Sequence, residues 1–379
     1  MTRCCSAAVV NDKLSITFVR RGYSPSGGAE AYLKRLARGF VDLGHNAALI
    51  TTVEWPKSEW SFGAITRLNA RSTIEFANAV ERECANRQGA LLFSLERIWR
   101  CDIFRAGDGV HRAWLDRRKK FEMPLQRFAR ALTAKHRDIL QLEEALFAKN
   151  GARRAIAASD MVRNEIVDLY GYPPEKIDIV RNGVPLAEFR VDSALREKAR
   201  TDLKLQPGEI ALLFVGSGWE RKGLLFAMQA MAMCRDKRMR LLVAGRGKTE
   251  SYYKSKHVRF LGEVVDLLPI YAAADIFILP TIYDPFSNAC LEALACGLPV
   301  ITTRANGFSE IIEHEVHGSI VDLPNDIAAL SNALQFWADA SRRESARSTI
   351  VERASRFDIS RNVEQTLAVV SRIAHQHAS

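Results

Sequence analysis

The chain has 379 residues, of which 47% are hydrophobic and 26% charged, and its formal net charge is +10. This length exceeds one ordinary hydrophobic core and predicts two domains. No apolar run reaches the roughly 18 residues of a membrane-spanning helix, and residues 1–10 lack the long apolar core of a signal peptide, so we expect a cytoplasmic protein. The seven cysteines include no Cys-x-x-Cys pair, which argues against a disulfide framework or a zinc site. The positive charge indicates an anionic partner: nucleic acid, anionic lipid or a phosphorylated ligand.

The first half of the chain alternates predicted strands and helices. Residues 14–19 predict a buried strand, a loop of Gly, Ser and Pro follows at 22–28, and residues 29–43 have the apolar spacing of a helix that ends at Gly44. The other expected elements of this half are strands at 47–52, 89–94, 102–106, 154–158 and 176–180, a helical region at 124–150, and a helix capped by Ser159 and Asp160. A strand, loop, helix and strand in this order form the unit of a parallel sheet.

The second half repeats the pattern. Its expected strands are 209–215, 239–244, 258–261, 276–279 and 299–302, and its expected helices are 223–234, 266–273, 288–296 and a last one at 359–374. Two successive sets predict two doubly wound α/β domains with a seam near residues 182–188. Ligands of open parallel sheets bind outside the carboxyl ends of the strands, so two such sheets facing each other would form a deep cleft.

The most informative stretch is residues 280–299. Asp284 lies in a loop after a predicted strand, a helix begins near Ser287 or Asn288, and Glu292 lies in its second turn. The unpaired N–H groups at the start of a helix carry partial positive charge and suit a phosphate or sugar oxygens. The two carboxylates flank that point and can accept hydrogen bonds from hydroxyls, which together suits a nucleotide sugar. The alternative is that Asp284 caps the helix and Glu292 is solvated.

This stretch resembles the acidic E-x7-E motif of family 4 glycosyltransferases, retaining enzymes with the GT-B fold. Asp284 stands at the first acidic position, Glu292 at the second, and the continuation Ala-Cys-Gly-Leu-Pro-Val-Ile matches. The resemblance implies that the first acid contacts the sugar hydroxyls and the second the ribose. It also implies two Rossmann-like domains facing a cleft, 1–183 on the acceptor side and 184–358 on the nucleotide-sugar side. We expect the last helix, within 359–379, to return to the first domain.

Three further segments resemble the donor site of that family. Gly216 follows a predicted strand and precedes Arg221 and Lys222, two cations that we expect to bind the diphosphate, with a solvated basic turn as the alternative. The segment at Val264 resembles the part whose backbone holds the base, and the loop before residue 29 resembles the glycine loop near the donor phosphates and the acceptor. The predicted donor-binding residues are Gly27, Gly28, Gly216, Val264, Phe286, Ser287, Asn288 and Glu292. The glycine pattern is not G-x-G-x-x-G, which weakens an oxidoreductase interpretation.

On the acceptor side the chain resembles the lipopolysaccharide core glucosyltransferases of the family. Residues 102–108 resemble a strand that ends in an acid in those enzymes, so Asp108 is predicted to face the acceptor hydroxyl or the reacting sugar. His111, one turn later, is the rival for that role. The predicted catalytic residues are Asp108, Arg221, Lys222 and Asp284.

Residues 111–137 combine many Arg and Lys with Trp, Phe and Leu. We call this segment the basic patch; Arg117, Arg118, Lys119 and Lys120 form its densest run. Such a surface suits anionic lipid, and the related enzymes contact a membrane here, so we expect peripheral attachment to the inner face of the cytoplasmic membrane. A solvated helix face is one alternative. A nucleic-acid arm is another, but no nucleic-acid motif accompanies the patch and we expect no nucleic-acid partner.

The expected reaction needs no cofactor and no metal. There is no Asp-x-Asp pair, and His314-x-x-His317 is interpreted as surface. The resemblance implies front-side attack on a nucleotide sugar, UDP-glucose by preference, with ADP-heptose, GDP-mannose and UDP-GlcNAc left open. The expected acceptor is a lipid-linked glycan such as lipopolysaccharide core. Two alternatives remain: a sugar-nucleotide epimerase of the same fold, and a basic non-enzymatic nucleic-acid-binding protein.

Overall fold

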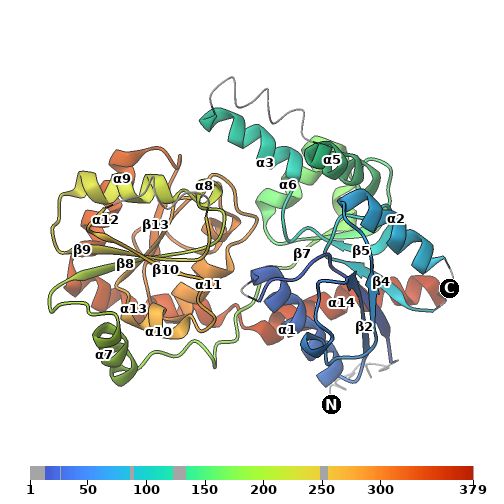
Figure 1. The fold of residues 1–379 in the computed structure, drawn as a ribbon, viewed down its shortest axis with the longest axis horizontal. Coiled ribbons are helices and arrows are strands. Elements are labelled where there is room, and N and C mark those ends of the chain that lie inside the picture. The colour runs from blue at the N-terminus through green and yellow to red at the C-terminus, as the bar shows by residue number, and fades with distance from the viewer. Residues whose placement is uncertain (1–12, 26, 86–88, 123–133, 248–254, 379) are drawn as a thin grey trace, which may run out of the picture.

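The protein folds into two lobes, each built on a parallel sheet between layers of helices (Figure 1). The computed structural model describes residues 13–25, 27–85, 89–122, 134–247 and 255–378. The fold class expected from the sequence, two doubly wound α/β units, is confirmed.

The first sheet has seven strands in the order β3-β2-β1-β4-β5-β6-β7, and neighbouring strands pair in parallel. The strands are β1 (Ser15–Val19), β2 (Asn46–Thr52), β3 (Ile65–Leu68), β4 (Leu91–Ser94), β5 (Cys101–Arg105), β6 (Ala152–Ala157) and β7 (Ile177–Ile179). The main helices of this lobe are α1 (Gly28–Asp42), α2 (Thr73–Cys84), α3 (His111–Arg118), α5 (Ala134–Leu146) and α6 (Asp160–Tyr170). The strand order reverses between β1 and β4, so this is where a ligand crevice is expected.

The second sheet has six strands in the order β10-β9-β8-β11-β12-β13, again all parallel. The strands are β8 (Ile210–Val215), β9 (Met239–Ala244), β10 (Val258–Gly262), β11 (Ile276–Leu279), β12 (Val300–Thr303) and β13 (Gly318–Val321). The helices are α7 (Ser193–Asp202), α8 (Trp219–Lys222), α9 (Leu224–Cys234), α10 (Leu268–Ala273), α11 (Asn288–Ala295), α12 (Ile327–Ala338) and α13 (Ala340–Ser355). The corresponding reversal lies between β8 and β11.

The last helix, α14 (Ile359–Ala378), crosses back and packs on α1 of the first lobe, as expected (Figure 1). Val363 lies against the backbone of Gly39, where an added Cβ would come within 2.6 Å of its side chain. The Tyr32 hydroxyl donates to Asn362 Oδ1 at 3.0 Å, a buried link between residues 330 positions apart. The returning helix therefore completes the core of the first lobe.

Several elements were not predicted from the sequence. β3 is a short edge strand with mostly half-exposed residues, so it lacks the apolar run of a core strand. α2 is capped by Ser72, whose hydroxyl accepts from Glu75 N, while the Glu75 carboxylate accepts from Arg71 N just before the cap. The helix expected at 124–150 is described as α5, and residues 123–133 lie outside the described part of the chain. None of the described helices is long and apolar enough to cross a bilayer.

One smaller expectation was wrong. His317, interpreted as a surface residue, is buried, and its Nδ1 accepts a hydrogen bond from Glu313 N at 3.0 Å. His314 is half-exposed and accepts from Ile320 N in the same way. The pair therefore holds the turn before β13 together, a role that its i, i+3 spacing does not reveal.

Candidate functional site

The acidic loop, residues 280–287, follows β11 and is fixed by its own backbone. Asp284 N donates to Ala305 O at 2.9 Å, and Gly307 N donates to Asp284 O at 2.9 Å. The helix begins where the sequence indicated, and its cap is Ser287, whose hydroxyl accepts from Cys290 N at 3.3 Å; Asp284, the cap of the alternative interpretation, does not have this role. Asp284 is only 4% exposed, and its carboxylate forms an ion pair with Lys222 Nζ. The loop therefore presents a rigid acid and the free N–H groups of α11 at the carboxyl end of the sheet.

Glu292 lies on the buried side of α11. The Tyr271 hydroxyl donates to Glu292 Oε2 at 3.0 Å, and Arg35 of α1, in the other lobe, lies 3.9 Å from Oε1. Burial raises the pKa of Glu292 to about 7, although the charge of Arg35 opposes this rise. The carboxyl is therefore neither solvated nor tightly paired, and one of its oxygens remains open to a further hydrogen-bond donor.

The loop after β8 brings two cations to the acidic loop. An added Cβ at Gly216 would lie 3.4 Å from the Lys222 side chain, so the lysine passes directly over this glycine before it reaches Asp284. Arg221 O accepts from Ile282 N at 2.8 Å, which ties α8 to the acidic loop. Within the described residues the Arg221 guanidinium has neither a hydrogen bond nor an ion pair, so it is available to an anionic ligand.

The glycine loop of the first lobe faces the start of α11. An added Cβ at Gly28 would lie 3.8 Å from Asn288 Nδ2, and one at Gly27 would collide with the carboxylate of Glu30. Gly28 thus lets the first lobe approach the second without a side chain between them, whereas Gly27 leaves room for Glu30 within the first lobe. The structure brings together Gly28, Gly216, Lys222, Asp284, Ser287 and Asn288, as the predicted donor site requires.

For two other predicted donor residues, Phe286 and Val264, the structure gives less direct evidence of a contact with the donor. Phe286 is 4% exposed and packs on Phe308 with ring centroids 6.0 Å apart, so only its backbone is open to a ligand. Val264 follows β10 and is half-buried against the core of the second lobe. Its backbone is the part that the sequence interpretation assigned to the base, and its role remains a prediction.

Asp108 follows β5, and its side chain is 49% exposed. Arg20 Nη1 donates to Asp108 Oδ2 at 3.0 Å and also lies 4.0 Å from Glu96. Burial opposes the ionisation of Asp108, but the charges of Arg20, Arg97 and Arg221 outweigh it and hold the pKa of this carboxyl below its usual value. Arg221, one of these three cations, belongs to the second lobe.

His111, the rival of Asp108, is engaged elsewhere. Its Nε2 lies 3.0 Å from His136 Nδ1, and its backbone N donates to Glu143 at 2.6 Å. Burial, together with the nearby charge of Arg97, lowers the pKa of His111 to about 4, so the imidazole is neutral at pH 7. Asp108 is thus the more accessible of the two groups.

The lobes are joined by an interface that the sequence did not reveal, the Tyr283 lock, formed by Gly109, Val110, Arg117, Glu165 and Tyr283. The Tyr283 hydroxyl donates to Glu165 at 2.7 Å and accepts from Val110 N at 2.7 Å. Arg117 pairs with Glu165 at 2.7 Å and covers the Tyr283 ring at 5.0 Å. Gly109 adopts φ +71°, and a Cβ there would meet the Tyr283 hydroxyl at 2.3 Å. The one sequence signal for this close approach of the two lobes is Gly109, the glycine that follows Asp108.

The described part of the basic patch is less exposed than expected. Arg118 is 13% exposed and pairs with Glu122 and Glu220, while Arg117 belongs to the Tyr283 lock. Lys119 is 59% exposed and pairs with Asp116 at 2.6 Å, and Lys120 is exposed. Of the four residues predicted to contact a membrane, the structure therefore leaves the two lysines outward.

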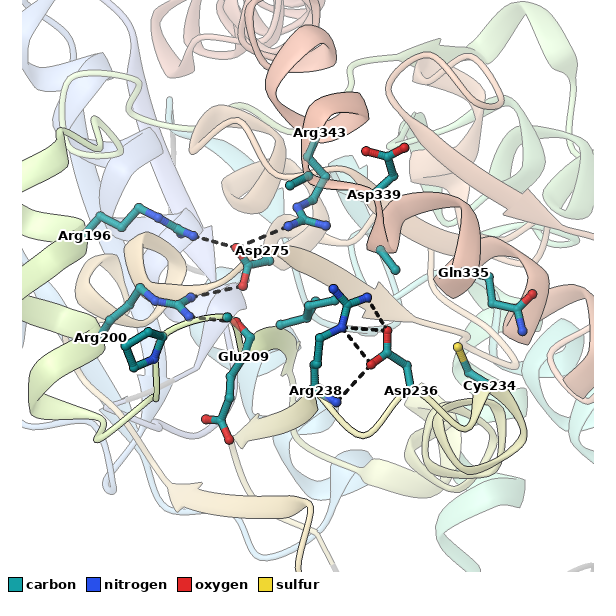
Figure 2. A pocket seen from close by; sticks show the side chains of 15 residues that line it. Arg196, Arg200, Glu209, Cys234, Asp236, Arg238, Asp275, Gln335, Asp339 and Arg343 are labelled. Atoms are coloured by element: carbon teal, nitrogen blue, oxygen red, sulfur yellow. Dashed lines mark hydrogen bonds and ion pairs between the residues drawn. The ribbon is translucent and has the colours of Figure 1, made fainter.

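A pocket of about 850 Å³ lies at the opposite, amino end of the second sheet. Figure 2 shows Arg196, Arg200 and Arg343 converging on Asp275, which immediately precedes β11. Arg196 and Arg200 also donate to backbone carbonyls at the end of α10. These contacts satisfy the arginines internally, and the pocket lies at the wrong edge of the sheet for a nucleotide. The candidate site is the cleft at the carboxyl edge.

Two protein families together match most of the chain. Residues 209–339 match the family described as glycosyl transferases group 1, and residues 26–188 match glycosyltransferase family 4. A probable transglycosylase of Burkholderia thailandensis is 30% identical over 368 residues, which are 92% of this chain and 94% of that protein. Other curated relatives match over shorter segments, and the chain spans about half the length of the first two, 51% and 47%.

Solved structures show the same fold at low identity. The crystal structure of WaaG, a glycosyltransferase involved in lipopolysaccharide biosynthesis, has a TM-score of 0.79 at 20% identity, covering 93% of this chain and 99% of that one. HepE of Anabaena, in complex with UDP and glucose, has a TM-score of 0.73 at 17% identity, covering 94% of this chain and 99% of that one. At these identities the likeness concerns the two-lobed fold.

Proposed function

The chain belongs to the group 1 glycosyl transferases, and we propose that it is a retaining enzyme that transfers a hexose, glucose from UDP-glucose, to a lipid-linked glycan such as lipopolysaccharide core. The observation that carries the proposal is the start of α11. Asp284 and Glu292 lie on either side of it, Lys222 pairs with Asp284, and Gly28 of the other lobe faces it. The bound UDP and glucose of HepE, and the lipopolysaccharide role given for WaaG, support the choice of donor and acceptor.

In the proposed reaction the acceptor oxygen attacks C1 of the sugar from the face that the diphosphate leaves. The C1–O bond to phosphate breaks, the new glycosidic bond forms, and the departing phosphate oxygen takes the acceptor proton. Arg221 and Lys222 stabilise the charge on the leaving diphosphate, and Asp284 accepts from a sugar hydroxyl. Lys222 then exchanges part of its contact with Asp284 for the phosphate. Asp108, kept ionised by Arg20, orients the acceptor hydroxyl.

The same arrangement supports a reaction without a divalent metal. Arg221 and Lys222 supply the positive charge that a metal ion would otherwise bring to the diphosphate. Turnover should therefore continue in excess EDTA. Loss of activity that magnesium or manganese restores would contradict this part of the proposal.

We place the enzyme at the inner face of the cytoplasmic membrane, where a lipid-linked acceptor is reached along a surface. Lys119 and Lys120 are exposed in the 3-10 turn Lys119–Phe121 that follows α3, and Asp108 lies just before this helix. Docking through these lysines would bring the acceptor side of the cleft to anionic lipid.

The experiment that tests the function is a thermal-shift panel of UDP-glucose, UDP-GlcNAc, GDP-mannose and ADP-heptose, followed by transfer assays with the best donor. A bound donor raises the melting temperature because it binds only the native state. We expect UDP-glucose to give the largest shift and transfer to require an acceptor. Sugar conversion without acceptor would favour an epimerase. Salt-sensitive DNA binding with no shift from any donor would favour a nucleic-acid-binding protein.

A further inference from the structure

A buried arginine without an acidic partner lies behind the donor site. Arg105, the last residue of β5, is 1% exposed, and no carboxylate of the described residues pairs with it. Its Nη2 donates to Asn182 Oδ1 at 2.6 Å and to Val180 O at 3.3 Å, and its guanidinium lies 4.4 Å from the centre of the Tyr32 ring. Burial lowers the pKa of Arg105, which nevertheless stays charged because no guanidinium in a protein loses its proton near pH 7. The cation is thus held by hydrogen bonds and an aromatic face alone.

The arginine fixes the orientation of two asparagine amides. Arg105 has donors only, so the Asn182 atom that faces it must be the oxygen. Asn182 Nδ2 must then point the other way, where it donates to Phe286 O at 3.2 Å and to Asn288 Oδ1 at 2.7 Å. The carbonyl of Phe286 accepts only, which requires the same orientation. Asn288 therefore turns its oxygen to Asn182 and its Nδ2 away.

The last group in this series of hydrogen bonds, Asn288 Nδ2, points to the cleft. Asn288 Nδ2 lies 3.8 Å from the position that a Cβ of Gly28 would occupy. Within the described part of the chain it has no hydrogen-bond partner, and Asn288 is only partly buried, at the first position of α11. A fixed, unpaired donor thus stands where the glycine loop meets the helix start.

We propose that Arg105, Asn182 and Asn288 form a hydrogen-bonded relay that aims Asn288 Nδ2 at a diphosphate oxygen of the nucleotide sugar. The relay rests on the proposed function, since it needs a nucleoside diphosphate at the start of α11. A phosphate oxygen only accepts, so it needs the donor orientation that the relay imposes, whereas a sugar hydroxyl would accept either orientation. The unneutralised charge of Arg105 favours an anion on the same side. Asn288 touches the ligand; Arg105 and Asn182 are positioning residues.

The contact is tested by calorimetry with UDP, or with the nucleoside diphosphate that the donor panel selects, against the matching nucleoside. Asn288→Ala should weaken diphosphate binding by about 10- to 100-fold, the usual effect of removing a hydrogen bond to a charged group, and should leave nucleoside binding unchanged. Asn288→Asp should weaken it further, because it places a carboxylate against the phosphate. If Asn288→Asp binds the diphosphate as well as wild type, the amide does not contact phosphate and the proposal is wrong.

The relay itself is tested at Asn182, which is separated from the cleft by Asn288, the residue to which it is hydrogen-bonded. Asn182→Asp keeps its shape and its contact with Arg105, but it cannot donate, so Asn288 must turn Nδ2 toward it and present an oxygen to the phosphate. We expect a loss of diphosphate affinity similar to that of Asn288→Ala, and no further loss when the two changes are combined. Additive losses would mean that Asn182→Asp acts through the negative charge it introduces and would overturn the relay.

Arg105→Met provides a second measurement that does not add a negative charge. It frees the Asn182 amide to turn, so diphosphate affinity should fall while nucleoside affinity is retained. A wild type that binds none of the nucleoside diphosphates overturns the proposed function and the relay with it. A wild type that binds one while the Asn182 and Asn288 variants bind it equally well overturns the relay alone.

Discussion

Two largely buried glutamates, Glu165 and Glu292, are alike in almost every electrostatic respect. Each side chain is 12% exposed, each accepts a hydrogen bond from a tyrosine hydroxyl, and burial raises the pKa of each to about 7. They differ in how closely an arginine approaches the carboxylate. Arg117 lies 2.7 Å from Glu165, whereas Arg35 lies 3.9 Å from Glu292. A raised pKa therefore does not show which of the two glutamates belongs to a ligand site.

What separates them is the neighbourhood of the carboxylate. Glu165 faces Tyr283 and Arg117 inside the closed interface between the lobes, where no space for a ligand is evident from its contacts. Glu292 lies in the helix whose start faces the glycine loop and the cations of the donor site. We infer that Glu165 holds the lobes together and that Glu292 holds the ribose. The predictions below test this division from the largest expected effect to the smallest.

The largest effect should come from the donor-side cations. Arg221→Ala with Lys222→Ala removes two charge-assisted contacts, each worth roughly 1.5–3 kcal/mol, so nucleoside-diphosphate affinity should fall on the order of 100-fold or more. Arg117→Ala, in the Tyr283 lock, is the comparison. It should lower the melting temperature, because it leaves Glu165 buried without its cation, and leave affinity nearly unchanged. Unchanged affinity in the double variant, measured by calorimetry, would contradict the diphosphate assignment.

The glutamates themselves give the next contrast. Glu292→Gln keeps the shape of the side chain but removes the charged acceptor, so donor affinity should fall by about 10- to 100-fold. Glu165→Gln should leave donor affinity within about twofold. Titration of both variants with the preferred nucleotide sugar checks the pair. Equal losses in the two variants would show that both act through the packing of the lobes.

The pH dependence of stability should treat the two glutamates alike. The pKa of each is raised from an ordinary value of 4.5 to about 7, so below about 4.5 the carboxyl is protonated both folded and unfolded. As pH rises from there, the unfolded chain ionises first and stability falls, until the loss is complete above about 7. Each group should contribute on the order of 1–3 kcal/mol to this fall. Either Gln variant should flatten the melting-temperature profile over that window; a variant profile parallel to wild type would show that its glutamate does not titrate there.

The donor half of the site could be predicted because its signals are local. Asp284, Ser287 and Glu292 lie within nine residues, and the backbone contacts of the acidic loop and the cap of α11 fix their geometry. Spacing in the sequence therefore corresponds to spacing in the structure. The fold class follows from equally local alternation of strands and helices.

The contacts between the lobes could not be predicted in this way. Tyr283 and Glu165 are 118 positions apart, and Asn182 and Asn288 are 106 apart, so no spacing rule joins them. The basic patch shows the same limit. Its composition gives the charge, but not that Arg117 and Arg118 are held by carboxylates from distant segments, Glu165 and Glu220.

The smallest expected effect concerns that patch. With Arg117 and Arg118 turned inward, the exposed cations in the described part of the basic patch are Lys119, Lys120, Lys135 and Arg137, and the test takes the two lysines of its densest run. A cation near such a surface contributes about 1 kcal/mol, and salt weakens it because exposed charges are screened within about 10 Å at 0.1 M. Changing both lysines to Glu should therefore lower binding to anionic vesicles by at least about tenfold at low salt, and by less at high salt.

The control variant for this test carries the same charge change on the other lobe. Lys198 and Lys204 are exposed, and Lys198 pairs with Asp202 much as Lys119 pairs with Asp116, so reversing them alters net charge equally. Co-sedimentation with neutral and anionic vesicles should show a loss for the Lys119 and Lys120 variant alone, with donor affinity retained in both. Equal losses would mean that net charge, and not this face, attracts the membrane. No loss in either would leave these lysines a solvated end of α3, and the division between lock and cleft would then rest on the donor-side measurements.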